Sequence, residues 1–183
     1  FIPCLERDAA GGRTEYAIKP GQYGRFLCEV FDEWYENGLP HISVRTFDSV
    51  VNYYVTGVPA VCTFGKSCDA YVLVERNGDV YPCDFFVFPE WKLGNIIDRE
   101  IEHFIVSGLK QKFAGYKSNL CKGCSRCEWK LMCWGGCLKE RLFPRHDYGA
   151  PTYFCAAYRN FFEHTHARFK HIAERLLGGS RNF

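Results

Sequence analysis

Cysteine spacing constrains this chain more than any other feature of its sequence. The 183 residues include 11 cysteines, an odd number that would leave one thiol over in a fully paired disulfide framework. Disulfide scaffolds are also usually small and poor in core residues, unlike this chain. We therefore expect metal binding to use most of the thiols in two groups: Cys62, Cys68 and Cys83, then Cys121, Cys124, Cys127, Cys133 and Cys137, with Cys155 further on.

The spacing leaves two metal chemistries open. Soft thiolates select zinc, copper(I) or iron–sulfur clusters. A [4Fe–4S] cluster takes one thiolate per iron, and a structural zinc site also takes four cysteines, typically as two CxxC pairs. The first group has three cysteines and no CxxC pair, so it must take its fourth ligand from the second group. Two interlocked sites follow, which is unlike a simple zinc ribbon.

Composition excludes several classes of protein. The chain is 47% hydrophobic and 17% aromatic, so a packed core is expected and intrinsic disorder is not. The net charge is +2 with no basic block, which argues against nucleic acid as a partner. No apolar run is long enough to cross a bilayer and no signal peptide is visible, so we expect no membrane partner and a cytoplasmic protein.

Hydrophobic periodicity predicts helices around a small hairpin. The expected elements are a helix from Pro20 to Asn37-Gly38, a strand over 41–47, a helix or strand over 50–55, a hairpin turning at Asn77-Gly78, short helices over 97–106 and 109–113, and a long amphipathic helix from Phe154 that stops at Gly178-Gly179. Residues 5–19 and 120–151 read as irregular, and the second stretch would need metal to become ordered.

The start of the chain suggests a piece of a longer protein. Residues Phe1-Ile2-Pro3 read like the end of a buried strand, and the only methionine is Met132. We therefore expect a fragment.

Eight of the cysteines have a spacing that resembles the SPASM domain of radical SAM enzymes. The pattern is Cys62-x5-Cys68-x14-Cys83 followed by Cys124-x2-Cys127-x5-Cys133-x3-Cys137-x17-Cys155. Residues 1–4, 26–34, 77–86 and 93–96 resemble anaerobic sulfatase maturases in particular. The resemblance implies an α+β fold. It places the end of a partial (β/α)6 radical SAM barrel and a linker helix over 1–57, then a SPASM domain over 58–183 with a β-hairpin, irregular cysteine-rich loops and a long C-terminal helix.

The resemblance also implies two auxiliary [4Fe–4S] clusters. One would be held by Cys62, Cys68, Cys83 and Cys137, and the other by Cys124, Cys127, Cys133 and Cys155. Gly135-Gly136 would let the backbone approach a cluster closely. Cys155 would sit at a helix start, where the dipole favours a thiolate. Cys121 could compete with Cys124 for cluster ligation, because Cys121-x2-Cys124-x2-Cys127 contains two overlapping CxxC pairs, or registers. Only the register that begins at Cys124 reproduces the family spacing.

In the family, the Asp after the third cysteine is the proposed base that deprotonates the substrate Cys or Ser. Here that residue is Asp84; the alternative is an ordinary loop carboxylate. If the hairpin strand extends so far, Cys83 and Asp84 point to opposite faces. The implied enzyme is an oxidoreductase that converts a sulfatase Cys or Ser to Cα-formylglycine. A 5′-deoxyadenosyl radical removes a Cβ hydrogen, and the first cluster accepts the remaining electron, directly or through its neighbour.

One family motif is absent from the sequence. No Cys-x3-Cys-x2-Cys triplet occurs, so the third [4Fe–4S] cluster and S-adenosyl-L-methionine would belong to a missing part, and the chain alone is expected to be inactive. The implied partners are a sulfatase polypeptide and an electron donor or acceptor such as a flavodoxin or ferredoxin.

Three alternatives remain open. They are a SPASM enzyme acting on another peptide, a structural Cys4 zinc module that binds a partner protein, and a disulfide-stabilised extracellular domain. Cys4 has no assigned role and Cys28 reads as a core thiol. The final-helix histidines read as solvated or capping groups, and three tryptophans as a wall around the clusters: His164, His166 and His171, and Trp91, Trp129 and Trp134.

Overall fold

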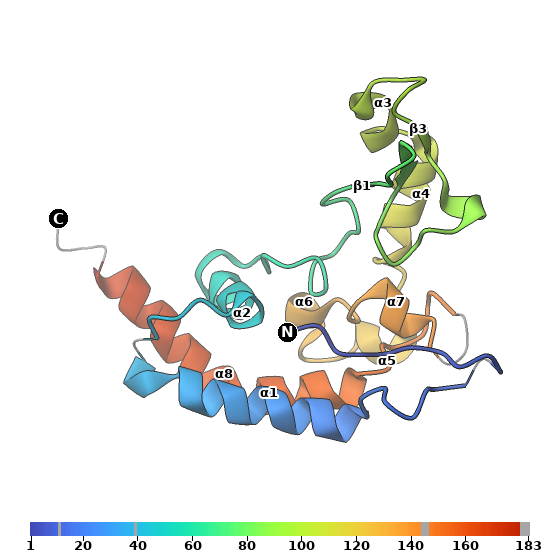
Figure 1. Cartoon of the computed structure of the whole chain (residues 1–183). Helices are drawn as coiled ribbons and strands as arrows, with labels where there is room; N and C mark the ends of the chain where they lie inside the picture. The colour runs from blue at the N-terminus through green and yellow to red at the C-terminus, as the bar shows by residue number, and fades with distance from the viewer. Residues whose placement is uncertain (11, 39, 144–146, 180–183) are drawn as a thin grey trace.

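A computed structural model describes residues 1–10, 12–38, 40–143 and 147–179; these form a set of helices and one small antiparallel sheet, which lies at one end of the molecule with α3 and α4 (Figure 1). The elements in chain order are α1 (Pro20–Trp34), η1 (Glu36–Gly38), α2 (Arg45–Thr56), β1 (Leu73–Val74), β2 (Asp79–Tyr81), η2 (Pro89–Trp91), β3 (Gly94–Asn95), α3 (Ile101–Ile105), α4 (Gly108–Tyr116), α5 (Lys122–Ser125), α6 (Lys130–Cys133), α7 (Leu138–Arg141) and α8 (Cys155–Gly179). None of the described helices is long and apolar enough to cross a membrane.

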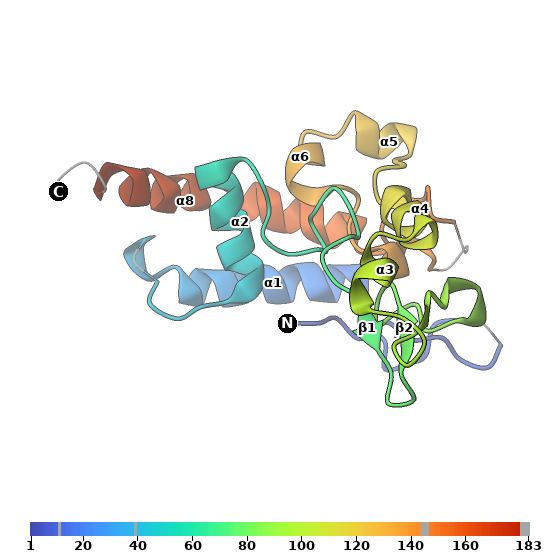
Figure 2. The same cartoon turned by 90° about the horizontal axis from the view of Figure 1, so that it is seen from above.

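Helices α1, α2 and α8 build the larger core. Helices α1 and α8 lie side by side, and α2 crosses them (Figure 2). The ring of Phe31 on α1 lies 4.6 Å from that of Phe169 on α8 and 5.6 Å from that of Phe47 on α2. A Cβ at Gly24 would stand 3.0 Å from Cα of Ala157, so the two long helices meet almost backbone to backbone. This core fixes where α8 begins.

The sheet belongs to a second, smaller core. Its strand order is β1-β2-β3, with Leu73 opposite Tyr81 and Val80 opposite Gly94. The turn between β1 and β2 has Gly78 at φ +84°, a conformation that favours glycine. Phe86, Trp91, Phe113 and Leu138 are buried together beside the sheet, and Cys68 and Cys83 pack against them.

The short helices α5, α6 and α7 lie between the α1–α8 pair and the unit formed by the sheet, α3 and α4 (Figure 1). Each of the three contains only four residues. This cysteine-rich stretch therefore joins the two cores, and its residues 144–146 lie outside the described part of the chain.

Several sequence expectations are confirmed. The first long helix begins at Pro20, the hairpin turns at Asn77-Gly78, and the last helix begins at Cys155, one residue after the expected start. The segment 50–55 is helical.

Other expectations are wrong. Residues 41–47 form no strand; α2 begins at Arg45, because Phe47, Val50 and Tyr54 share a helical face on the core. Helix α3 begins at Ile101 rather than at 97. Helix α8 still contains Gly178 and Gly179. Residues 1–3 form no strand, and Ile2 is exposed.

Candidate metal centre

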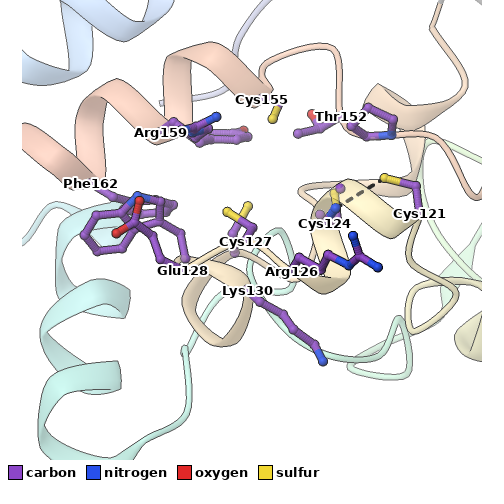
Figure 3. A pocket seen from close by; sticks show the side chains of 16 residues that line it. Cys121, Cys124, Arg126, Cys127, Glu128, Lys130, Thr152, Cys155, Arg159 and Phe162 are labelled. Atoms are coloured by element: carbon purple, nitrogen blue, oxygen red, sulfur yellow. Dashed lines mark hydrogen bonds between the residues drawn. The ribbon is translucent and has the colours of Figure 1, made fainter.

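Five cysteines line one cavity of about 520 Å³ between α5, α6 and the start of α8. They are Cys121, Cys124, Cys127, Cys133 and Cys155. Figure 3 shows Cys155 on one wall and Cys127 and Cys124 on the wall across from it, with Cys121 beside Cys124. The structure thus brings together all four residues expected in one site, which we call the second cysteine set: Cys124, Cys127, Cys133 and Cys155.

Cys121 has a local structural role in this cavity. It is the N-cap of α5, and its Sγ accepts a hydrogen bond from the backbone N–H of Cys124 at 3.4 Å. A capping side chain satisfies a backbone donor that the helix leaves free. Cys121 is therefore accounted for without metal, which supports the Cys124 register.

The chain reverses sharply after α6. Trp134, Gly135 and Gly136 all have positive φ, at 45°, 72° and 71°. A Cβ at Gly136 would stand 2.6 Å from Cβ of Thr152, and one at Gly135 would stand 2.6 Å from Nη2 of Arg141. The two glycines are required by this turn and by protein neighbours, which is a different reason from the cluster approach that the sequence suggested.

The other four expected ligands, which we call the first cysteine set, come from the loop between α2 and β1, the loop after β2 and the start of α7: Cys62 and Cys68, Cys83, and Cys137.

Two buried lysines tie these loops together. The Lys110 ammonium donates to the carbonyls of Cys68, Tyr71 and Pro82 at 2.9, 2.6 and 3.1 Å, and Pro82 directly precedes Cys83.

Lys117 completes the link. Its ammonium donates to the carbonyl of Thr63 at 2.7 Å and to that of Gly136. Thr63 follows Cys62, and Gly136 precedes Cys137. The backbone around all four members of the first cysteine set is therefore held by two side chains from α4 and its C-terminal end.

Burial raises the pKa of four thiols, two in each set. It raises the pKa of Cys83 and Cys133 to about 11 and that of Cys124 and Cys137 to about 12. These four thiols are therefore protonated at neutral pH in the metal-free chain. A metal must displace these protons, so its binding and the ordering of the loops are linked.

The donor set fits an iron–sulfur cluster. Both sets offer only thiols, the ligands that such clusters take. Among the described residues, no three His, Cys, Asp or Glu side chains converge tightly enough for a single metal ion. A zinc ion with Zn–S bonds of about 2.3 Å would need sulfurs within about 3.8 Å of each other.

Trp129 gives a second sign that the cavity suits a cluster. It lines the cavity, and its indole N–H is buried with no hydrogen-bond acceptor in the described part of the chain. A buried donor without a partner is costly. Sulfur atoms of a cluster accept such hydrogen bonds.

Asp84 lies where strand geometry no longer applies. Strand β2 ends at Tyr81, and Asp84 is an exposed turn residue. Its Oδ1 accepts hydrogen bonds from the Tyr71 hydroxyl at 2.6 Å and from the Cys83 thiol at 3.2 Å. The expectation that Cys83 and Asp84 point to opposite faces is therefore wrong.

The same contacts set the charge of Asp84. Partial burial raises the pKa of the carboxyl, but the hydrogen bonds from Tyr71 and Cys83 lower it more, so the net shift is downward. Asp84 is ionised at neutral pH and its side chain is open to solvent. The sequence analysis missed Tyr71. Tyr71 precedes the hairpin and Asp84 follows it, and no sequence pattern predicts a hydrogen bond between two such positions.

Three buried cations were also missed. Lys110 is 2% exposed, and Lys117 and Arg141 are fully buried. None of them forms a salt bridge with a carboxylate in the ranges that the structure describes. The Arg141 guanidinium instead donates to backbone carbonyls, those of Tyr116, Lys117, Asn119, Trp134, Gly135 and Tyr148.

The remaining candidates lie away from the two sets. Cys4 is exposed, and Cys28 is buried in the larger core as expected. His164 pairs with Asp32 at 2.8 Å, and His166 bonds the Tyr54 hydroxyl at 2.5 Å. These histidines have protein partners and are not arranged as metal ligands. Trp91 lies in the smaller core, outside the cavity, and its indole N–H donates to the Tyr148 hydroxyl. Trp129 lines the cavity, as expected of a residue beside a cluster.

Comparison with known proteins agrees with this geometry. Residues 62–128 match the SPASM family, an iron–sulfur cluster-binding domain. The matched segment contains five of the eight expected ligands, and the other three follow it: Cys133, Cys137 and Cys155.

Curated relatives match almost the whole chain. A cysteine-type anaerobic sulfatase-maturating enzyme of Clostridium perfringens is 32% identical over 179 residues, which are 96% of this chain and 48% of that protein. A serine-type anaerobic sulfatase-maturating enzyme of Bacteroides thetaiotaomicron is 37% identical over 96% of this chain and 43% of its own length. The chain spans about half the length of the curated relatives it matches.

A solved structure, native anSMEcpe with bound AdoMet and Cp18Cys peptide, has the same fold. It superposes with a TM-score of 0.82 at 32% identity and covers 95% of this chain and 48% of its own. The mixed architecture of helices and a small antiparallel sheet is therefore shared with that protein.

Proposed function

Since the chain carries a SPASM iron–sulfur domain and is homologous along its length to anaerobic sulfatase-maturating enzymes, we propose that it binds two auxiliary [4Fe–4S] clusters for such an enzyme. The enzyme would be a radical SAM oxidoreductase that converts a Cys or Ser of a sulfatase to Cα-formylglycine. Relatives of both the cysteine type and the serine type match, so the choice between the two substrates stays open.

The arrangement of the eight cysteines supports the proposal. Lys110 and Lys117 hold together backbone carbonyls of, or next to, the members of the first cysteine set. The second cysteine set lines a cavity whose wall contains the unpartnered N–H of Trp129. Each set would hold one cluster, and a bound cluster supplies one-electron transfer.

Asp84 is the proposed base. Its carboxylate is ionised, exposed and fixed by the Tyr71 hydroxyl, so it can accept the proton of a substrate thiol or hydroxyl. Cys83 lies directly beside it, which places the proton acceptor next to the first cysteine set.

Other parts of the reaction would lie outside this sequence. No Cys-x3-Cys-x2-Cys motif is present. We propose that a third cluster and S-adenosyl-L-methionine bind elsewhere in the enzyme, and that the chain alone is inactive. Residues 1–57 would then continue the radical SAM barrel and 58–183 form the SPASM domain. A sulfatase polypeptide and a flavodoxin or ferredoxin remain the proposed partners, and the cytoplasm the proposed location.

Two rival functions differ in a measurable way. A SPASM enzyme for another peptide would bind the same clusters but would not modify a sulfatase-derived peptide. A Cys4 zinc module would hold zinc. The all-thiol sets without a tight single-ion site favour clusters. The disulfide alternative is contradicted, because all eleven cysteines are free.

The division of ligands can be tested with two variants. Cys83→Ala should remove one cluster and Cys155→Ala the other, so each should retain about half of the wild-type iron, or about four irons per chain. Iron and acid-labile sulfide would be counted after anaerobic purification. Unchanged iron in either variant would refute the ligand assignment of that cysteine.

A further inference from the structure

The positive charges of the buried side chains Lys110, Lys117 and Arg141 have no role in the function proposed so far. Burying an ammonium or guanidinium ion is costly unless an opposite charge lies nearby. Their hydrogen bonds go to carbonyl oxygens, which satisfy their donors but do not cancel their charge. The arrangement therefore needs an anion close to these three side chains.

No carboxylate among the described residues forms a salt bridge with these three side chains. Glu140 is the buried acid of the region, but its oxygens accept hydrogen bonds from Thr152 and Tyr158 at 2.5 and 3.0 Å rather than from the three cations. A cluster with four thiolate ligands would be anionic, and the cysteines that would hold it are those next to the carbonyls that the lysines bind.

Lys117 is bonded to the turn that joins the two cysteine sets. Its hydrogen bonds reach the carbonyls of Thr63 and Gly136, next to Cys62 and Cys137 of the first set. The backbone N–H of Gly136 in turn donates to the carbonyl of Cys133, a member of the second set, at 3.0 Å.

Lys110 provides a natural comparison. It is also a buried lysine bound to backbone carbonyls, but these lie beside Cys68 and Cys83, both in the first set. The two lysines thus have the same chemistry and similar burial, and they differ in which cysteine sets they face.

We propose that Lys117 is a counter-charge shared by the two clusters, which raises the reduction potential of both, whereas Lys110 acts on the first cluster alone. This inference rests on the proposed function. Each electron adds a negative charge to a cluster, so a fixed positive charge nearby stabilises the reduced state. Both lysines are positioning residues that also hold the loops of the first set.

The test compares Lys117→Gln with Lys110→Gln in the full 183-residue chain, purified anaerobically with its clusters. Glutamine keeps two N–H donors for the carbonyls but removes the charge. Redox titrations would be followed by electron paramagnetic resonance, with the two signals assigned from Cys83→Ala and Cys155→Ala. We expect Lys117→Gln to shift both midpoint potentials to more negative values and Lys110→Gln to shift only that of the first cluster.

Other outcomes overturn the inference. Unchanged potentials in Lys117→Gln, with its iron retained, would show that the charge does not act on the clusters. Equal effects of the two variants on both clusters would refute the difference between the lysines. If Lys117→Gln loses iron, Lys117→Arg, which keeps the charge, should retain it. Loss of iron in both variants would refute the inference, because it would show that Lys117 acts only through its hydrogen bonds to the loops. A wild-type chain without iron would instead refute the proposed function.

Discussion

The Tyr71 hydroxyl donates a 2.6 Å hydrogen bond to the Asp84 carboxylate, at the rim of the first cysteine set. Tyr71 Oη is also 3.4 Å from Cys83 Sγ, so one hydroxyl contacts both the proposed base and a proposed cluster ligand. The orientation of Asp84 therefore depends on a residue 13 positions earlier, on the other side of the hairpin.

Replacing the proposed base should stop the reaction without removing the clusters. In an enzyme that also supplies the radical-forming part, Asp84→Asn should lower formylglycine formation about 100-fold or more, since a positioned base contributes at least that much. Tyr71→Phe should lower it less, because Asp84 loses only its orienting donor. Peptide mass spectrometry would measure the product.

A matched control for Asp84 is Asp98→Asn, which changes an exposed carboxylate on the loop after β3. It should leave the rate and the iron content unchanged. Full activity of Asp84→Asn would assign Asp84 the role of an ordinary loop carboxylate.

The N–H of Trp129 should matter to the second cluster. Trp129→Phe removes the unpartnered donor from the cavity wall but keeps an aromatic ring. We expect unchanged iron and a more negative midpoint potential of the second cluster, because hydrogen bonds to cluster sulfur stabilise the reduced state. Trp91→Phe is the control, since its N–H bonds Tyr148 at 3.2 Å outside the cavity. Equal shifts in both variants would contradict this role.

Cys121 should be replaceable by another capping residue. Cys121→Ser keeps an acceptor for the Cys124 N–H and should retain about eight irons, whereas Cys124→Ser should lose about half of them. Iron analysis of the two variants measures the difference. The opposite result, with iron lost only from Cys121→Ser, would show that the competing register is the correct one.

The turn before Cys137 should be intolerant of any side chain. Gly136→Ala forces a Cβ into a positive φ and to 2.6 Å from Thr152, so we expect a loss of about 2 kcal/mol or more in unfolding free energy. Gly115→Ala is the control, because Gly115 is helical with no neighbour within 4 Å and should gain up to about 1 kcal/mol. Anaerobic denaturant unfolding would compare them, and equal stability of the two variants would contradict the strain argument.

The sequence predicted those features that depend on local pattern. The apolar residues of α1 repeat at helical spacing, and Asn77-Gly78 is a strong turn signal, so both elements are confirmed. The family resemblance also implied that Cys124, Cys127, Cys133 and Cys155 belong to one site, and the structure places these four around one cavity. The eight ligand assignments and the division at residue 57 remain predictions.

The features that sequence reasoning missed depend on contacts between distant residues. Residues 41–47 alternate like a strand, but packing of Phe47 and Val50 against α8 selects a helix from Arg45. Lysine and arginine are usually exposed, so nothing in the sequence marked Lys117 or Arg141 as buried. Their burial becomes visible only when the loops that carry their carbonyl partners come together.

The most direct test of the central claim is to count iron, sulfide and zinc in the chain purified without oxygen. Two clusters predict about eight irons and about eight acid-labile sulfides per chain, with negligible zinc. Stoichiometric zinc without iron would contradict the account.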